Sequence, residues 1–442
     1  MNRKLQKLAL GLCALSVTSA LAGEWANWRG PAHNGSSPET DLPKSWSKTE
    51  NVLWKAAMSG RSAATPIISG GYVFVSSTDE QTDELYAIAL DRSNGKERWR
   101  SKVAKDIRRD DRSTYAASSP VTDGETVVFF FGNGELQGFD LGGHKRWERN
   151  IQDDYGDFAF QWTFSSSPVI YKGRLYLQVL QRNVPVRGKG KEGAESYLLA
   201  MNPKTGETEW KHVRPSDAYM ESLEAFSTPV PYTHDGREEL ILVGGDCITG
   251  HNPVTGKEYW RWGTWNPQKI GHWRLVPSPA VGGGVALACA PKREPIFAVN
   301  LGGQGTLSDD DLAWVSDDNR DLSSDVPTPA FAEGDFFILS DVRNALSRVE
   351  PKTGKVKWTT ELPRGAKYRS SPTVADGAVY FLNHDGVAFV VDSENGAIQK
   401  EIEMGKRGGV VRSSVAVSEG QLFIRTMDEL FCIGSKSSVA SR

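Results

Sequence analysis

Residues 166–210 read SSPVIYKGRLYLQVLQRNVPVRGKGKEGAESYLLAMNPKTGETEW. The stretch opens with two small residues and a proline, continues through short β-rich runs, and ends with Thr205-Gly206 followed by Trp210. Short apolar runs bounded by Gly, Pro and Asn are typical of β-strands. The Thr-Gly pair predicts a tight hairpin, because glycine supplies the positive φ that such a turn needs. The stretch therefore predicts one sheet of four short strands.

The same phrase recurs along the whole chain. A unit of about 40 to 50 residues with four strands is the sequence signature of a propeller blade. Eight copies predict an all-β fold, an eight-bladed β-propeller of four-stranded antiparallel blades. Seven blades would result if the fifth or the eighth copy were not a true repeat. The openings of the copies are anchored at Pro66, Pro120, Pro168, Pro229, Pro279, Pro329, Pro372 and, with valine in place of proline, Val415.

The last copy supplies only three strands, the third ending at residues 430–433, before the chain runs out. The missing fourth strand is available at the other end of the chain, in residues 51–55. Pairing the N-terminal strand with the C-terminal blade would remove two exposed sheet edges. We therefore expect a ring that is closed by the two ends of the propeller sequence.

The fourth strand of most units carries a tryptophan, and the seventh unit has Ile398 near that place. A buried aromatic ring removes about 150 to 250 Å² from water. We expect each indole to dock between neighbouring sheets. The docking residues predicted in this way are Trp54, Trp99, Trp147, Trp210, Trp260, Trp314 and Trp358.

The first 22 residues have the pattern of a secretory signal peptide. A positive start is followed by a short apolar run and by Ala20-Leu21-Ala22, which predicts cleavage near Ala22. The apolar run is shorter than the roughly 20 residues that span a bilayer, so no transmembrane segment is expected in the mature chain. We expect a signal peptide (1–22), an N-terminal extension (23–50), the propeller (51–434) and a C-terminal tail (435–442). A periplasmic and a secreted location both stay open.

Charge and cysteine content exclude some classes of protein. The net charge of −3 gives no global basic field, so no nucleic-acid partner is expected. Cys247, Cys289 and Cys432 are odd in number and far apart, which favours buried free thiols. The acidic residues of segment 308–325 offer oxygen ligands for calcium, but they lack the spacing of an EF-hand, and a solvated surface hairpin is the alternative. No metal site is assigned.

In a propeller, the connections that lead into each innermost strand gather around the mouth of the central channel. These connections are rich in arginine and aromatic residues here, and arginine grips carboxylates and stacks on planar rings. The alternative is that these groups pair with one another and line a water-filled tunnel. Residues 184–193 form an insertion that is either a flexible loop or a partner-docking loop. The predicted ligand-binding residues at the mouth are Arg61, Arg112, Trp162, Glu224, Trp273, Arg274, Arg369 and Arg412.

Residues 200–210, AMNPKTGETEW, are similar to the tryptophan-docking motif of propellers with pyrroloquinoline-quinone (PQQ) repeats. Residues 28–31, WRGP, and 51–55, NVLWK, resemble the start of secreted PQQ-like propellers, a family that includes quinoproteins and BamB-like proteins. The resemblance covers essentially the whole mature chain and is specific for fold rather than function. It implies PQQ with calcium as the cofactor to consider, although the chain lacks the vicinal cysteines of quinoprotein alcohol dehydrogenases.

Two functions follow from these patterns. The first is an exported, non-catalytic scaffold in the cell envelope, which binds another envelope protein or a small acidic or planar ligand. The alternative is a PQQ-dependent dehydrogenase with its site in the channel mouth. We assign no catalytic residue and no certain cofactor, because the calcium-binding cluster of the dehydrogenases does not map onto this sequence.

Overall fold

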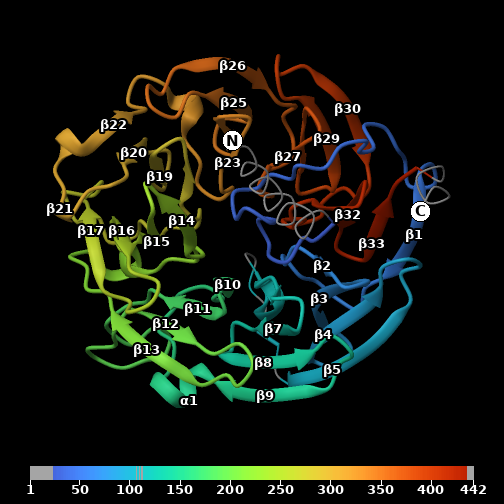
Figure 1. Cartoon of the computed structure of the whole chain (residues 1–442), viewed down its shortest axis with the longest axis horizontal. Coiled ribbons are helices and arrows are strands. Elements are labelled where there is room, and N and C mark those ends of the chain that lie inside the picture. The colour runs from blue at the N-terminus through green and yellow to red at the C-terminus, as the bar shows by residue number, and fades with distance from the viewer. Residues whose placement is uncertain (1–22, 106, 109, 111–112, 436–442) are drawn as a thin grey trace, which may run out of the picture.

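The computed structural model describes residues 23–105, 107–108, 110 and 113–435. It contains eight antiparallel sheets around a central axis (Figure 1). The predicted all-β, eight-bladed propeller is therefore confirmed, and the seven-bladed alternative is wrong. The predicted signal peptide lies outside the described residues. In the described part of the chain, no helix is both long and apolar enough to cross a membrane.

Each blade contributes one strand to each of four concentric layers. The innermost strands are β2 (Ile67–Ser69), β6 (Val121–Thr122), β10 (Val169–Tyr171), β14 (Val230–His234), β18 (Ala280–Gly282), β23 (Ala330–Ala332), β27 (Thr373–Ala375) and β31 (Ala416–Ser418). The second strands are β3 (Tyr72–Asp79), β7 (Thr126–Phe130), β11 (Arg174–Val179), β15 (Arg237–Gly244), β19 (Val285–Cys289), β24 (Asp335–Ser340), β28 (Ala378–Leu382) and β32 (Gln421–Arg425).

The third strands are β4 (Glu84–Asp91), β8 (Glu135–Asp140), β12 (Tyr197–Met201), β16 (Cys247–His251), β20 (Ile296–Asn300), β25 (Ala345–Val349), β29 (Val387–Asp392) and β33 (Glu429–Ile433). The outermost strands are β5 (Glu97–Lys105), β9 (Lys145–Asn150), β13 (Thr208–Val213), β17 (Glu258–Trp262), β22 (Leu312–Val315), β26 (Val356–Glu361), β30 (Ile398–Glu403) and β1 (Val52–Ala57). We number the blades 1 to 8 in this order.

A few short elements lie outside the four layers. Strand β21 (Gly305–Thr306) is added to the outer edge of blade 4. The helix α1 (Ile151–Tyr155) follows β9, and Asn150 caps its N-terminus. The 3₁₀ turns are η1 (Tyr115–Ala117), η2 (Met220–Leu223), η3 (Asp309–Asp311) and η4 (Arg320–Leu322).

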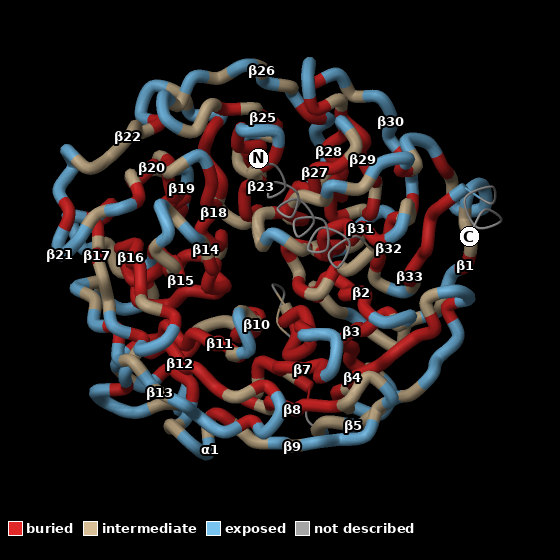
Figure 2. The backbone as a smooth tube through the Cα atoms, in the orientation of Figure 1, coloured by how far each residue is buried: buried red, intermediate tan, exposed pale blue. Residues whose placement is uncertain are grey.

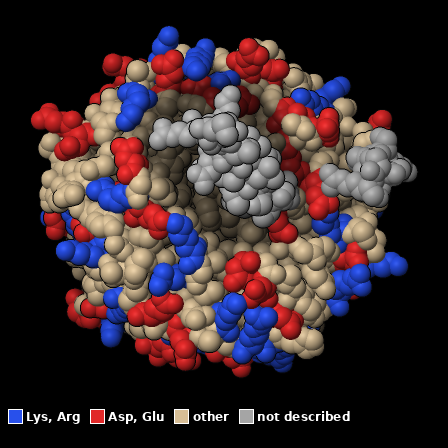
Figure 3. Space-filling view, in the orientation of Figure 1, with Lys and Arg blue, Asp and Glu red and all other residues tan. Residues whose placement is uncertain are grey.

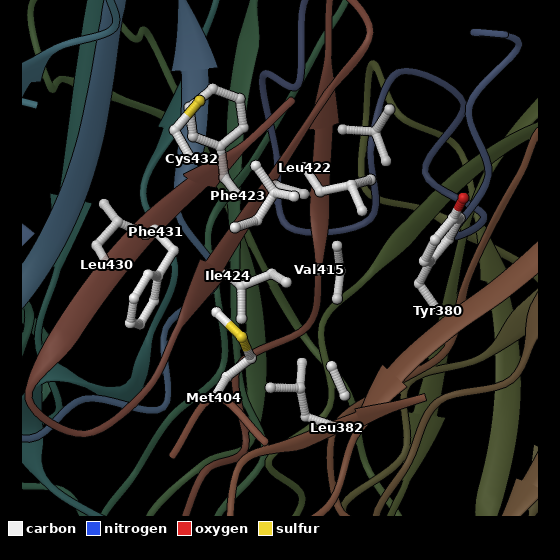
Figure 4. Close-up of a cluster of buried hydrophobic side chains, with 14 of the residues drawn as sticks. Tyr380, Leu382, Met404, Val415, Leu422, Phe423, Ile424, Leu430, Phe431 and Cys432 are labelled. Carbon is white, nitrogen blue, oxygen red and sulfur yellow. The ribbon is translucent and has the colours of Figure 1, made fainter. Parts of the chain in front are cut away.

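The hydrophobic core lies between blades rather than at one centre. In β24, Phe336 and Ile338 pack toward blade 5, whereas Phe337 and Leu339 pack toward blade 7. Successive side chains of a strand point to opposite faces, so a strand covered on both faces needs a continuous apolar run. Figure 2 shows this buried interior inside a partly exposed outer layer, and Figure 4 shows side chains of blade 8 packed near Tyr380 and Leu382 of blade 7.

The ends of the propeller sequence close the ring. Strand β1 pairs antiparallel with β33, with Trp54 opposite Cys432 and Ala57 opposite Glu429. Blade 8 is thus built from three C-terminal strands and one N-terminal strand, as the sequence predicted. The three cysteines of the described chain are buried and form no disulfide, which confirms the prediction of free thiols.

Six of the seven predicted docking tryptophans lie against the turn between the third and fourth strands of the next blade. The indole Nε1 of Trp99 donates to the carbonyl oxygen of Leu141 at 2.9 Å, and the ring covers Gly143. A Cβ atom on Gly143 would lie 2.5 Å from that ring, so only glycine fits. The indole ring covers the turn glycine in the same way in the pairs Trp54 and Gly95, Trp147 and Gly206, Trp210 and Gly256, Trp314 and Gly354, and Trp358 and Gly396.

Two blades depart from this arrangement for structural reasons. Trp260 donates to Glu239 of its own blade and is covered by β21, because the corresponding connection of blade 5 is longer and crosses to blade 4. Blade 7 has Ile398 instead of tryptophan, and the blade that follows it has no such turn. Ring closure leaves β33 and β1 unconnected, so an indole there would have no turn glycine to dock on.

A closed ring of hydrogen bonds surrounds the channel. In every blade, the residue just before the anchoring Pro (or Val415) is Ser or Thr, and its hydroxyl accepts the backbone N–H of the same position in the preceding blade at 2.8 to 3.2 Å. This hydroxyl ring links all eight innermost strands. Its members are Thr65, Ser119, Ser167, Thr228, Ser278, Thr328, Ser371 and Ser414.

The segment 23–50 packs on the face where the first and second strands of the blades are joined. Trp25 pairs with Ile68 of blade 1, and Ser36 pairs with Val374 of blade 7. The guanidinium of Arg29 is buried and donates to the carbonyl oxygens of Pro329 and Pro372, at 2.9 and 3.0 Å. The segment therefore connects blade 1 with blades 6 and 7, which lie on the other side of blade 8.

Candidate functional site: the channel mouth

The central channel holds a cavity of about 150 Å³. The hydroxyl ring lines it, and so does Trp28 of the N-terminal segment. The next layer consists of the residues two positions ahead of each ring hydroxyl, because alternate side chains of an extended chain point the same way. Those eight residues all line the cavity: Ala63, Ala117, Ser165, Phe226, Val276, Val326, Arg369 and Arg412.

Four of the predicted mouth residues come together in this lining: Trp162, Arg274, Arg369 and Arg412. Two carboxylates stand close to them without lining the cavity. Glu221 accepts the indole N–H of Trp162 at 3.0 Å, and its Oε1 is 3.9 Å from Nε of Arg274. Oδ2 of Asp341 is 3.7 Å from Nε of Arg369. These acids hold the guanidinium groups in place while the described lining itself carries only positive charge.

The other predicted residues lie elsewhere. Arg61 pairs with Glu80, with 3.2 Å between Nε and Oε1, and does not line the cavity. Trp273 is buried, and its backbone N–H donates to Ser222. Arg112 lies outside the described residues. Arg61 and Arg274 both lie four positions ahead of the hydroxyl-ring residue of their blade. At this distance from the innermost strand, the alternation of side chains along the strand no longer sets the direction of the side chain.

Glu224 is fully buried behind the mouth. It accepts the backbone N–H of Gln161 at 3.0 Å and forms an ion pair with Arg182. Burial raises its pKa to about 7, although the charge of Arg182 opposes this shift. Glu224 thus connects the Trp162 loop to blade 3 from behind instead of facing the channel.

A second pocket of about 200 Å³ shares Trp162 as a wall with the channel. Phe158, Phe160 and Phe164 line it, and Arg108, Arg187 and Lys189 contribute positive charge. Arg187 and Lys189 come from the predicted insertion 184–193, so this loop lies next to the mouth.

Sequence reasoning missed two parts of the site. Trp28 lines the channel, although the sequence indicates it only as part of a family motif. The repeat pattern indicates the hydroxyl-ring position only as a small residue before the anchor. The signal was present, because all eight copies have Ser or Thr at that position, and a repeated polar residue beside an apolar strand indicates a repeated hydrogen bond.

The described lining does not fit PQQ with calcium. Calcium takes oxygen ligands, mostly from carboxylates and carbonyls. No Asp, Glu, Asn or Gln is among the described residues that line the cavity. In the acidic segment, Asp311 is used to cap η3, and the segment forms no metal-ligand cluster within the described ranges.

The fold, the docking tryptophans and the polar channel define a propeller of the PQQ-repeat class. The sequence matches the family described as outer membrane protein assembly factor BamB, over residues 44–187 and 255–429. This match covers more than half of the chain, so the protein belongs to that family. No curated protein matches the sequence closely enough to count as a relative.

Solved structures share the fold at low sequence identity. A europium-containing methanol dehydrogenase is 11% identical with a TM-score of 0.67, over 93% of this chain and 98% of that one. BamB from Moraxella catarrhalis is 14% identical with a TM-score of 0.59, over 87% and 97%. Quinohemoprotein alcohol dehydrogenase from Comamonas testosteroni is 13% identical with a TM-score of 0.65, over 95% and 82%. At these identities the likeness concerns the fold alone.

Proposed function

We propose that the protein is an exported scaffold of the cell envelope that holds an anionic group of a partner protein or ligand in its channel mouth. The observation that carries the proposal is the lining, which contains Arg274, Arg369, Arg412 and Trp162 and in which no described residue is acidic. Arginine binds carboxylates through paired, charge-assisted hydrogen bonds. An anion would therefore gain both charge and hydrogen bonds at this place.

The hydroxyl ring adds further donors beneath the arginines. Each ring oxygen accepts a backbone N–H from the neighbouring blade, and among the described residues none of these hydroxyls is used as a donor to a protein group. A hydroxyl that accepts one bond still has its own proton to donate. The floor of the cavity can thus donate to an anion that enters between the arginines.

The size of the cavity favours the end of a larger molecule over a whole cofactor. Pockets for drug-sized ligands measure roughly 300 to 1,000 Å³, and this cavity measures about 150 Å³. An acidic side chain, a chain terminus or a small carboxylate fits this volume. Together with the lack of calcium ligands in the described lining, this favours the scaffold over the PQQ-dependent dehydrogenase.

The proposed location rests on two observations. The pattern of residues 1–22 predicts a signal peptide with cleavage near Ala22, which would direct the chain out of the cytoplasm. The family description names an assembly factor for outer membrane proteins, which supports an envelope protein as partner.

In vivo photo-crosslinking tests this function. A photoreactive amino acid replaces Val326 in the mouth, and a control replaces Val254, which is 54% exposed on a hairpin turn. We expect a covalent adduct of defined mass, protein or small molecule, with the Val326 variant only. The adduct should disappear when Arg369→Gln and Arg412→Gln are added. Equal labelling at both positions, or an adduct that persists without the arginines, contradicts the proposal.

A further inference from the structure

Three side chains of the type that ligate metals meet between blades 3 and 4. His212 comes from β13, His251 from the end of β16, and Glu258 from the start of β17. One potential ligand atom of each residue lies within 4.8 Å of the other two. Within the described part of the chain, this is the one group of three or more such residues at this spacing.

The position of His212 explains why it faces blade 4. It stands two residues after the docking Trp210, on the same side of the strand. At the corresponding position of other blades, Arg149 and Thr360 donate to the carbonyl of the next blade's turn glycine, at 2.6 and 2.5 Å. Here that carbonyl belongs to Gly256 and is occupied by His251 at 3.0 Å. The His212 ring instead packs edge-on against the His251 ring, with 5.2 Å between centroids.

His251 occupies a position that is apolar in most other blades. The corresponding residues, which directly precede the polar first residue of the turn, are Leu90, Phe139, Met201, Val349 and Val391. A buried imidazole costs free energy unless its nitrogens are bonded. The structure therefore places a polar ring where packing alone would select an aliphatic or aromatic side chain.

The hydrogen bonds of His251 prepare one nitrogen as a ligand. Nδ1 lies 3.0 Å from the carbonyl oxygen of Gly256, so Nδ1 carries the proton and donates it. Nε2 then holds the lone pair, and it lies 2.9 Å from the hydroxyl of Thr249. Metal-ligating histidines usually donate their second ring nitrogen to a carbonyl or carboxylate in this manner. Nε2 becomes free for a metal ion when the Thr249 side chain turns about its Cα–Cβ bond and moves its oxygen away.

Two arginines lie close to this group and affect how strongly it can bind a metal ion. Arg261 donates to both carboxylate oxygens of Glu258, at 2.6 and 2.7 Å. Nε of Arg214 donates to the Thr249 hydroxyl at 2.8 Å. Each carboxylate oxygen can accept a second partner, so Glu258 can be shared between Arg261 and a metal ion. The positive charges weaken binding, which favours an ion that is held strongly by imidazole.

We propose that His212, His251 and Glu258 bind one divalent transition-metal ion, best matched by Zn²⁺, which ties blade 3 to blade 4. Zn²⁺ accepts two imidazoles, a carboxylate and a water molecule in a tetrahedral arrangement with bonds of about 2.0 to 2.2 Å. Ligand atoms around such an ion are roughly 3.4 Å apart. The half-buried side chains of His212 and Glu258 turn inward to reach this spacing.

Titration calorimetry of tag-free mature chain with Zn²⁺ tests the site. We expect one equivalent of Zn²⁺ to bind, and at least about tenfold weaker binding for His212→Ala and for the isosteric Glu258→Gln, since each removes one ligand. His144→Ala is the matched control, because His144 is exposed beside Asp140 on another blade and should leave binding unchanged. Circular dichroism confirms that each variant is folded.

Cobalt substitution gives a second readout. Bound Co²⁺ should show the intense visible absorption of a four-coordinate site in the wild type and in His144→Ala, but not in His212→Ala. Three results overturn the proposal: no stoichiometric Zn²⁺ binding by the wild type, equal affinity of wild type and His212→Ala, or a Co²⁺ spectrum that is the same in both.

Discussion

Arg369 and Arg412 occupy the same place in blades 7 and 8, two residues ahead of the hydroxyl ring. The same position in the other six blades carries small or apolar residues, from Ala63 to Val326. Arg274 adds its charge from blade 5, so the positive charge of the mouth is contributed by blades 5, 7 and 8. The mouth is thus asymmetric, and an anionic partner would bind it in one orientation.

The buried carboxyl of Glu224 predicts a pH-dependent stability. Its folded pKa of about 7 lies above its ordinary value of 4.5, so the folded state holds a proton that the unfolded state has lost between these pH values. The contribution of Glu224 to stability should be fully present below about pH 4.5 and should be lost as the pH rises through 7. Relative to Glu224→Gln, the wild type should lose on the order of 3 kcal/mol across this interval.

Urea unfolding of both proteins at a series of pH values measures this difference. Glu224→Gln removes the titration while keeping a side chain of the same shape behind Trp162. A difference in unfolding free energy that stays constant with pH, or that grows in favour of the wild type as the pH rises, would show that Glu224 is ionised throughout.

At the scale of the elements, a testable prediction concerns the contact between the Trp314 indole of blade 5 and the turn glycine Gly354 of blade 6. Gly354 has φ of +68° and lies under the Trp314 ring, which a Cβ atom would meet at 2.7 Å. Gly334 has φ of +80°, but nothing lies within 4 Å of its Cβ position. Both alanine variants should lose about 1 to 2 kcal/mol from backbone strain, and Gly354→Ala should lose about 1 to 3 kcal/mol more from the clash.

Denaturant unfolding of the two variants measures the contribution of docking directly. The difference between Gly354→Ala and Gly334→Ala isolates the indole contact, because the positive φ is common to both. Equal destabilisation of the two variants would mean that Trp314 can move away at no cost.

The hydroxyl ring predicts a second element-scale effect. Ser278→Ala removes the acceptor of the Thr228 backbone N–H and leaves that buried group without a partner, which should cost about 1 to 3 kcal/mol. Ser278→Thr keeps the hydroxyl, and Thr228 and Thr328 show that the position accepts threonine in neighbouring blades. Ser278→Thr should therefore retain most of the stability.

Hydrogen exchange at the Thr228 amide checks this effect at the bond itself. Exchange should become faster in Ser278→Ala and stay slow in Ser278→Thr. Similar protection in all three proteins would show that the ring bond contributes little to the opening of the innermost strands.

The sequence predicted these elements because the repeat specifies them locally. Proline anchors, turn glycines and alternating or continuous apolar runs act within one blade, so a single copy such as 166–210 defines the strand order. The exceptions at Trp260 and Ile398 depend on neighbouring blades. They follow from the long connection of blade 5, which crosses to blade 4, and from the absence of a turn between β33 and β1 in blade 8.

For the whole molecule, ring closure predicts that the two ends of the propeller sequence can be joined. Ala57 and Glu429 are paired in the β1–β33 ladder and are not buried. The variant with Ala57→Cys and Glu429→Cys should form a disulfide under oxidising conditions. Because the bond closes nearly the whole chain into a loop, it should stabilise the fold by up to about 5 kcal/mol.

Thiol titration and urea unfolding of the oxidised and reduced variant measure this effect. The reduced form is the control and should unfold near the wild-type midpoint. Failure of the two cysteines to pair in the folded protein would contradict the register of the closing strands.

The channel mouth was only partly predictable from the sequence. Arg369 and Arg412 were found because they lie on the extended approach to the innermost strand, where the alternation of side chains still holds. Arg61 and Glu224 lie further out, where ion pairs with Glu80 and Arg182 decide the direction of the side chain. Such ion pairs form between segments that are distant in the sequence, so no local sequence pattern predicts them.

The most direct test of the proposed site is the affinity of an anionic probe for the mouth. Fluorescence anisotropy with a labelled oligoglutamate peptide compares the wild type, Arg369→Gln/Arg412→Gln, and the control Arg98→Gln/Arg146→Gln, whose arginines are exposed on the outermost strands β5 and β9. The two double variants lose the same net charge. We predict binding by the wild type and the control, and about tenfold or weaker binding when the mouth arginines are removed. Equal affinities of the two double variants, or no binding by the wild type, would contradict the account.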